Sequence, residues 1–195
     1  FDENAELWTN IILGFSENFN FEISTGKSIR KLNIENNYFN DYVGNDLQNL
    51  RFGGKAIIFN KNLYFPVTSG FRMTFGRALG ETWPGYLFIE NINTINLSNR
   101  LRFNFSPKIA WTGSGNPSAI GSSLIFDINE YYSIILERNT ALKNADSNFT
   151  SALRISKNPN RFFDLYLTDA VNFNDIGETI NAKETYFGIK TGFKF

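Results

Sequence analysis

The chain of 195 residues contains neither His nor Cys. Without Cys it can form no disulfide, thiolate metal site or cysteine nucleophile, and without His it lacks the commonest general base and the commonest metal ligand. We find no two acidic residues whose placement on adjacent strands points to a catalytic dyad. We therefore expect no enzyme, no metal site and no cofactor.

The charged side chains instead alternate with apolar ones, most clearly in residues 101–111. One face of this segment carries Leu101, Phe103, Phe105, Pro107, Ile109 and Trp111, and the other carries Arg102, Asn104, Ser106, Lys108 and Ala110. Residues 63–76 and 187–195 divide in the same way. Because successive side chains of a strand point to opposite faces, each segment predicts a strand with one apolar and one polar face.

Further segments of about ten residues have the same period of two. They predict strands near 5–15, 19–29, 49–59, 85–97, 118–128, 131–140, 148–156 and 161–171. Short turns near 16–18, 60–62, 98–99, 129–130 and 158–160 alternate with longer loops near 30–48, 78–84, 113–117, 141–147 and 172–183. This asymmetry is typical of a transmembrane β-barrel. The fold expected is therefore all-β, an antiparallel up-and-down transmembrane barrel formed by residues 1–195 as a single domain.

The strand count bears on whether this barrel is complete. The segments above number about eleven, whereas a barrel with both ends on one side of the membrane needs an even number. We expect about 12 strands (10–12), with one strand or region missing upstream of Phe1 or hidden in a weak stretch such as 30–48. Residues 30–48 either fold into the lumen or form a mobile surface loop, and the surface loop is favoured.

Alternation alone does not show whether the apolar faces meet lipid or fill the interior of a soluble barrel. The polar faces carry many Gly, Ser, Thr and Asn residues, which suits a crowded lumen better than a water-facing surface. Aromatic residues also gather at strand ends, among them Trp8, Trp83, Trp111, Phe19, Tyr131, Tyr132, Phe162 and Phe163. Both features favour lipid outside. Within 85–97 either register puts Glu90, or Asn91 and Asn93, on the outer face, so we expect a bulge or a strand partly above the bilayer.

The last ten residues resemble the C-terminal signal by which the assembly machinery of bacterial outer membranes recognises its substrates. Apolar residues alternate behind a terminal Phe, namely Phe187, Ile189, Phe193 and Phe195, although Lys190 and Thr191 depart from the pattern. The whole chain resembles small porin-like outer-membrane barrels of Gram-negative bacteria. Its Asn/Phe-rich hairpins are similar to the hairpins of outer-membrane barrels from cyanobacteria. The resemblance implies an outer-membrane location, with lipids and the assembly machinery as partners. The formal charge of zero argues against nucleic acid as a partner.

The inward face of such a barrel carries more basic than acidic residues. Its candidate pore-lining residues are Arg72, Arg102, Lys108, Arg154, Lys190, Lys55, Glu137 and Asp164, with Arg51, Lys194, Glu22 and Asp127 on the same face. Charges of one sign favour permeation of the opposite sign, so the sequence predicts a channel for passive diffusion of small solutes, with a preference for anions. The favoured alternative for the charges is pairing across strands, for which Arg154 and Asp164 are well placed.

Two other functions fit the same pattern. A non-conducting barrel would serve as a membrane anchor, an adhesin or the translocator domain of a longer protein. A soluble lipid-binding barrel would turn its Phe faces inward. A protein of the second kind would fold without detergent.

Overall fold

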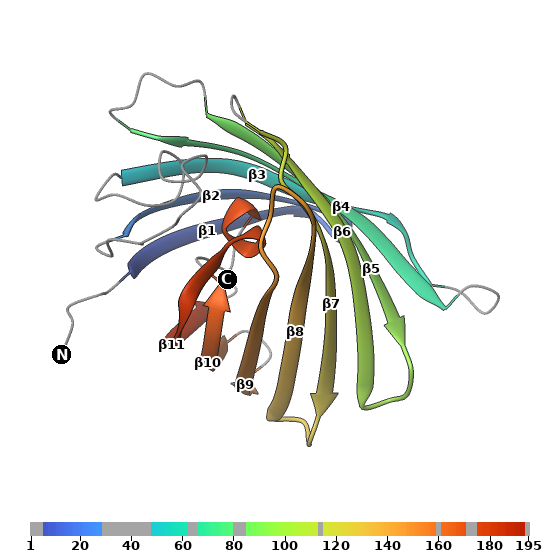
Figure 1. The fold of residues 1–195 in the computed structure, drawn as a ribbon. Helices are drawn as coiled ribbons and strands as arrows, with labels where there is room; N and C mark the ends of the chain where they lie inside the picture. The colour runs from blue at the N-terminus through green and yellow to red at the C-terminus, as the bar shows by residue number, and fades with distance from the viewer. Residues whose placement is uncertain are drawn as a thin grey trace.

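The computed structural model describes residues 6–28, 48–61, 66–79, 85–112, 115–158, 161–170 and 175–193. They form one antiparallel sheet in which each strand pairs with the next along the chain (Figure 1). The strands are β1 (Glu6–Ser16), β2 (Phe19–Ser28), β3 (Gln48–Phe59), β4 (Val67–Ala78), β5 (Tyr86–Asn96), β6 (Leu101–Trp111), β7 (Ser118–Asp127), β8 (Tyr132–Lys143), β9 (Asn148–Asn158), β10 (Arg161–Ala170) and β11 (Asn181–Phe193). A short 3-10 helix, η1 (Asp175–Thr179), precedes β11.

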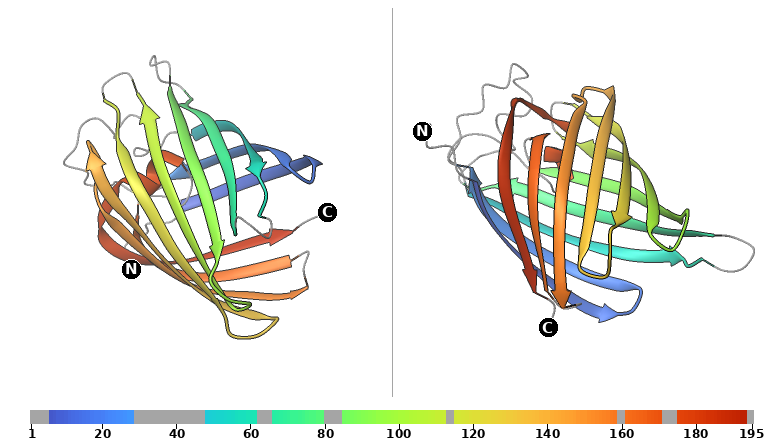
Figure 2. Two further views of the ribbon diagram at one scale, coloured as in Figure 1. Left: turned by 90° about the vertical axis from the view of Figure 1, so that its right-hand side faces the viewer. Right: turned by 90° about the horizontal axis from the view of Figure 1, so that it is seen from below.

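The predicted all-β, up-and-down order is confirmed. The sheet curls strongly about its concave side, as the two turned views show (Figure 2). Its edges are β1 and β11, which are not paired with each other in the described residues, so the predicted closure into a barrel is not seen. Because the described strands number eleven, these two edge strands run in the same direction. The described residues contain no helix long and apolar enough to cross a membrane.

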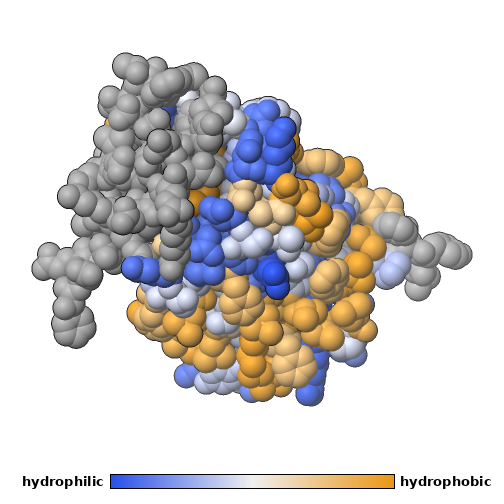
Figure 3. Space-filling model, in the orientation of Figure 1, coloured by the Kyte–Doolittle hydropathy of each residue, from blue (hydrophilic) through white to orange (hydrophobic). Residues whose placement is uncertain are grey.

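The two faces of the sheet differ as the alternation predicts. On the convex face of β4, Phe71, Met73 and Phe75 are 43%, 55% and 48% exposed, whereas Thr74 on the concave face is buried. The convex face of the other strands exposes Leu13, Phe15, Phe52, Phe105, Leu124, Phe126, Leu136, Phe149, Leu167, Phe187 and Ile189 in the same way. Hydrophobic side chains form a band across the lower part of the molecule in Figure 3, with hydrophilic ones above and below it. Most of the exposed large apolar groups therefore lie on the convex side, and most of the charged groups of the strands lie on the concave side.

Strand β5 has no bulge, so the first of the two alternatives expected for it is wrong. Its pairing with β4 is continuous from Val67 opposite Ile95 to Gly76 opposite Tyr86. Glu90 consequently lies on the concave face. Asn91 and Asn93 lie on the convex face of the same strand, where their side-chain amides bond to one another. Asn93 Nδ2 donates to Asn91 Oδ1 at 2.7 Å, and the hydroxyl of Ser69 donates to Asn93 Oδ1 at 2.8 Å. These bonds satisfy polar groups on a face that is mostly apolar, although it also carries Ser122 and the exposed Arg138.

Aromatic rings on the concave face cover glycines of the neighbouring strand. Tyr166 lies opposite Gly188, and Phe162 lies opposite Gly192. Phe162 therefore points inward and does not belong to a ring of aromatics around the outside of the sheet. In each pair a Cβ on the glycine would overlap the ring, so the absence of a side chain is what lets the ring lie flat over the backbone.

Replacing Gly188 by Ala should therefore lower the free energy of unfolding by about 1–3 kcal/mol, because the new methyl group displaces the Tyr166 ring. Urea titration of the folded protein measures the loss. Gly14→Ala is the matched control, since a Cβ there meets nothing within 4 Å. Equal stability of the two variants would show that the ring does not need the glycine.

Candidate functional site beneath the short helix

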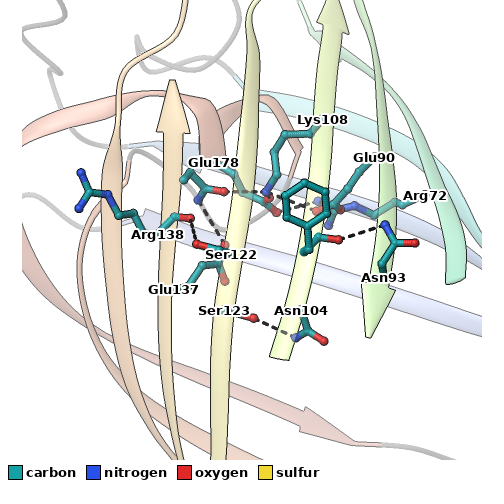
Figure 4. A network of polar contacts seen from close by, with 12 residues as sticks. Arg72, Glu90, Asn93, Asn104, Lys108, Ser122, Ser123, Glu137, Arg138 and Glu178 are labelled. Carbon is teal, nitrogen blue, oxygen red and sulfur yellow. Dashed lines mark hydrogen bonds and ion pairs between the residues drawn. The ribbon is translucent and has the colours of Figure 1, made fainter. Parts of the chain in front are cut away.

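Charged side chains from four strands converge on η1 at the concave face. Arg72 on β4, Glu90 on β5, Lys108 on β6 and Glu137 on β8 are brought there because each occupies an inward position of its strand. Glu178 comes from η1 and points down among them (Figure 4). The cluster therefore joins a helix near the end of the chain to the middle of the sheet.

Two cations and two carboxylates form a closed ring of ion pairs. Arg72 Nη2 lies 2.7 Å from Glu178 Oε1 and 2.9 Å from Glu90 Oε2. Lys108 Nζ lies 2.6 Å from Glu178 Oε2 and 3.3 Å from Glu90 Oε1. Each group thus has two partners of opposite charge, which is the arrangement that offsets the cost of removing buried charges from water.

Two asparagines extend this ring and hold the backbone of η1. Lys108 Nζ donates to Asn139 Oδ1 at 2.8 Å, and Asn139 Nδ2 donates to Asn148 Oδ1 at 3.0 Å. Asn148 Nδ2 in turn donates to the Glu178 carbonyl at 2.7 Å. All three side chains are buried, so the helix is held by its main chain as well as by its carboxylate.

An apolar contact accompanies the polar one. Ile176 and Ile180 are fully buried against Tyr86, Phe88 and Ala110. The inward face of β5 thus begins with the aromatic residues Tyr86 and Phe88, where η1 docks, and its first charged residue is Glu90. Burying two isoleucine side chains contributes on the order of 3–6 kcal/mol, so η1 is a packed part of the interior.

The ion pairs also fix the charge of Glu178. Burial alone raises the pKa of this carboxyl, but the charges of Arg72 and Lys108, and their hydrogen bonds to it, outweigh burial and lower the pKa to about 2. Glu178 therefore carries its negative charge at neutral pH and keeps it until the medium becomes strongly acidic.

A cavity of about 170 Å³ adjoins the ion pairs on the concave side. Its wall is formed by Arg72, Glu90, Ile92, Asn104, Ser106, Ser122, Ser123, Glu137 and Glu178. Carboxylates, hydroxyls and one amide make up most of this wall. Such a lining suits a small polar or charged solute better than an apolar one.

The other predicted pore-lining residues occupy the concave face outside this cluster. Arg154 and Asp164 form the ion pair that the sequence favoured, with Nη2 and Oδ2 2.7 Å apart. Arg102 pairs with Asp127 at 2.9 Å. Lys55 and Lys190 lie at inward positions opposite Arg72 and Asp164 respectively.

The proposed assembly signal lies only partly within the described structure. Phe187 and Ile189 are on the convex face of β11, where they are 60% and 56% exposed. Phe195, Lys194 and the side chain of Phe193 lie outside the described residues, and so does nearly all of the predicted loop 30–48.

Sequence reasoning missed the two carboxylates at the centre of the site. Glu90 was assigned to a doubtful strand, although its poor fit was the available signal that a charge had to point inward. Glu178 lay in the predicted loop 172–183, in which the structure instead places η1 and the first residues of β11. Ile176 and Ile180 lie on either side of Glu178 in the sequence. Their presence in a segment otherwise rich in polar residues was the signal for a segment with an apolar side.

Within the described ranges, His, Cys, Asp and Glu side chains form no group of three or more placed to hold a metal ion. Comparison of the chain with protein-family models, with curated proteins and with solved structures finds no match.

Proposed function

We propose that this protein is a β-barrel of a bacterial outer membrane that acts as a channel for passive diffusion of small solutes. The observation that carries the proposal is the distribution of side chains over the two faces. The convex face exposes Phe, Leu, Ile and Met, while the concave face holds Arg, Lys, Glu and Asp in ion pairs. An apolar convex face is stable against lipid, and a charged, ion-paired concave face is stable around an aqueous lumen.

The same distribution disfavours a soluble lipid-binding barrel. Such a barrel needs an apolar interior to take up acyl chains. Here the centre of the concave face is occupied by Arg72, Glu90, Lys108 and Glu178. An acyl chain lying there would remove water from these charges. The free energy lost in this way would far exceed the free energy gained by burying the acyl chain.

Closure of the sheet is part of the proposal. In lipid, every unpaired backbone group on the edges of β1 and β11 would cost several kcal/mol, so the edges must be paired when the protein is in a membrane. Direct pairing of β1 with β11 would be parallel, because the two strands run in the same direction. An additional strand between them would restore an antiparallel barrel with an even number of strands.

The test has two stages. The purified chain is folded with and without detergent, its gel mobility is compared before and after boiling, and the folded protein is then added to planar lipid bilayers. We expect a boiling-dependent shift only with detergent, followed by discrete current steps. Folding without detergent would contradict the membrane location. A detergent-folded protein that gives no current would leave the non-conducting anchor or translocator as the better function.

A further inference from the structure

Arg138 on β8 is an exposed cation on the mostly apolar convex face of the sheet. It follows Glu137, which lines the concave cavity, so its side chain points the opposite way, as Figure 4 shows. Its guanidinium forms no ion pair with a carboxylate of the described residues. An arginine on a lipid-facing surface is costly unless it reaches the headgroups or meets an anion. The position of Arg138 therefore requires a counter-charge.

The convex face of the β7–β8 hairpin changes character at the level of Arg138. Toward the short turn it exposes Leu124, Phe126, Ile134 and Leu136. Toward the other end it carries the polar strip, namely Ser118, Ser122, Arg138, Thr140 and Lys143, with Ile120 among them. The change falls at the same level on both strands, because Leu124 pairs with Leu136 and the next outward pair is Ser122 with Arg138. A surface divided in this way matches a lipid molecule, which is likewise divided into acyl chains and a polar headgroup.

The polar strip carries two positive charges, on Arg138 and Lys143, and no negative one. On the far side of β7, the outward residues of β6 also include no acid; they are Leu101, Phe103, Phe105, Pro107, Ile109 and Trp111. On the far side of β8, the connection to β9 contains Asp146, and the convex face of β10 carries Asp169. Asp169 Oδ1 already accepts a hydrogen bond from the main-chain nitrogen of Phe149 at 2.6 Å. An anion is therefore attracted to the β7 side of the strip.

The donors of the polar strip suit a phosphate group. The guanidinium of Arg138 is a planar fork of N–H groups that matches two phosphate oxygens, and the ammonium of Lys143 adds a second charge. The hydroxyls of Ser118 and Thr140 form no hydrogen bond within the described part of the chain and are able to donate to the same group. The hydroxyl of Ser122 instead donates to the Arg138 carbonyl at 3.3 Å.

We propose that the polar strip binds the phosphate of an anionic lipid headgroup, and that the acyl chains of this lipid lie over Leu124 and Leu136. The proposal rests on the membrane location proposed above and names a class of lipid that the protein holds. A second copy of the chain is a poorer occupant, since it would have to supply the missing negative charge. The acid on the convex face of the described strands, Asp169, is already bonded to Phe149 and to Asn181.

The test uses single cysteines carrying a small fluorophore that brominated lipids quench, because the natural chain contains no Cys. Ile109→Cys places the label on β6 opposite Ser118, beside the polar strip. Met73→Cys is the control, on the convex face of β4 with Gly54 and Ile89 opposite it. Each protein is folded into equimolar vesicles of phosphatidylcholine and phosphatidylglycerol in which one lipid or the other is brominated.

At the Ile109 position we expect phosphatidylglycerol to be enriched about fivefold over phosphatidylcholine, the effect of one cation beside an anionic headgroup. At the Met73 position the two lipids should quench equally. Arg138→Gln should lower the ratio at Ile109 toward one, whereas Arg138→Lys should keep part of the enrichment, because it retains the charge and loses the fork.

The outcomes separate this proposal from the membrane location on which it rests. The same ratio at Ile109 with Arg138 and with Arg138→Gln would overturn the headgroup site while leaving the barrel in lipid. Quenching at Met73 without quenching at Ile109 would also overturn it, since protein, such as a second copy, would then cover the strip. An absence of quenching at both positions would overturn the membrane location itself.

Discussion

Replacing Met73 by Arg should lower the free energy of unfolding in phospholipid vesicles by about 2–4 kcal/mol, the cost of placing a charge at the middle of the lipid-facing surface of a barrel. Met73 lies near the centre of β4, is 55% exposed and has Gly54 and Ile89 opposite it. In water the same substitution at so exposed a position would change stability by about 0.5 kcal/mol or less. The two environments therefore predict clearly different results. Urea titration of vesicle-bound protein gives the measurement.

A second arginine substitution controls for the effect of the residue type itself. Phe19 is the first residue of β2, beside the turn at Glu17 and Asn18, and is 43% exposed. Near the membrane surface an arginine costs only about 0–1 kcal/mol, so Phe19→Arg should be tolerated. If Met73→Arg were no worse than Phe19→Arg, the convex face would not lie in lipid and the proposed membrane location would fail.

The strands themselves were predictable because their signal is local. Each has a period of two and ends at residues that favour turns, so both its position and its inward face can be identified within about ten residues. Arg72, Lys108 and Glu137 were assigned to the correct face on this basis, and the pairing of Arg154 with Asp164 followed from a hairpin separation of ten residues.

The centre of the site was not predictable because its signal is not local. Glu178 bonds Arg72 across 106 residues of sequence and Lys108 across 70. Nothing in the alternation of β4 or β6 indicates that a loop carboxylate will neutralise their cations. The preference for anions inferred from sequence counted these cations without that partner and without Glu90. The charge of a lumen therefore depends on the segments that fold into it as well as on its strands.

The error in β5 has a different physical origin. A polar residue on a lipid-facing strand suggests an irregularity only if its hydrogen bonds are left unsatisfied. Asn91 and Asn93 bond to each other, and Ser69 on β4 supplies a further donor. The regular register of β5 is thus compatible with polar side chains on both faces, and Glu90 is free to point inward.

Replacing Glu178 by Ala should release η1 from the concave face. The substitution removes one carboxylate partner from Arg72 and one from Lys108, and leaves Glu90 as the remaining carboxylate of the ring. Breaking a buried ion pair costs about 3–5 kcal/mol, which corresponds to a change of more than a hundredfold in the equilibrium between docked and released helix. The packing of Ile176 and Ile180 remains and opposes this release.

A single introduced cysteine measures the release directly, because the natural chain contains none. Ile180→Cys places a thiol at a fully buried position, so a water-soluble thiol reagent should label it slowly in the Glu178 background and much faster in Glu178→Ala. Leu167→Cys, on the exposed convex face of β10, should label at the same rate in both backgrounds. The same Glu178→Ala protein should conduct more current per pore, since η1 then no longer occupies the lumen. Unchanged labelling of Cys at position 180 would mean that apolar packing alone holds the helix, and the ion pairs would then serve to set the charge of the cavity.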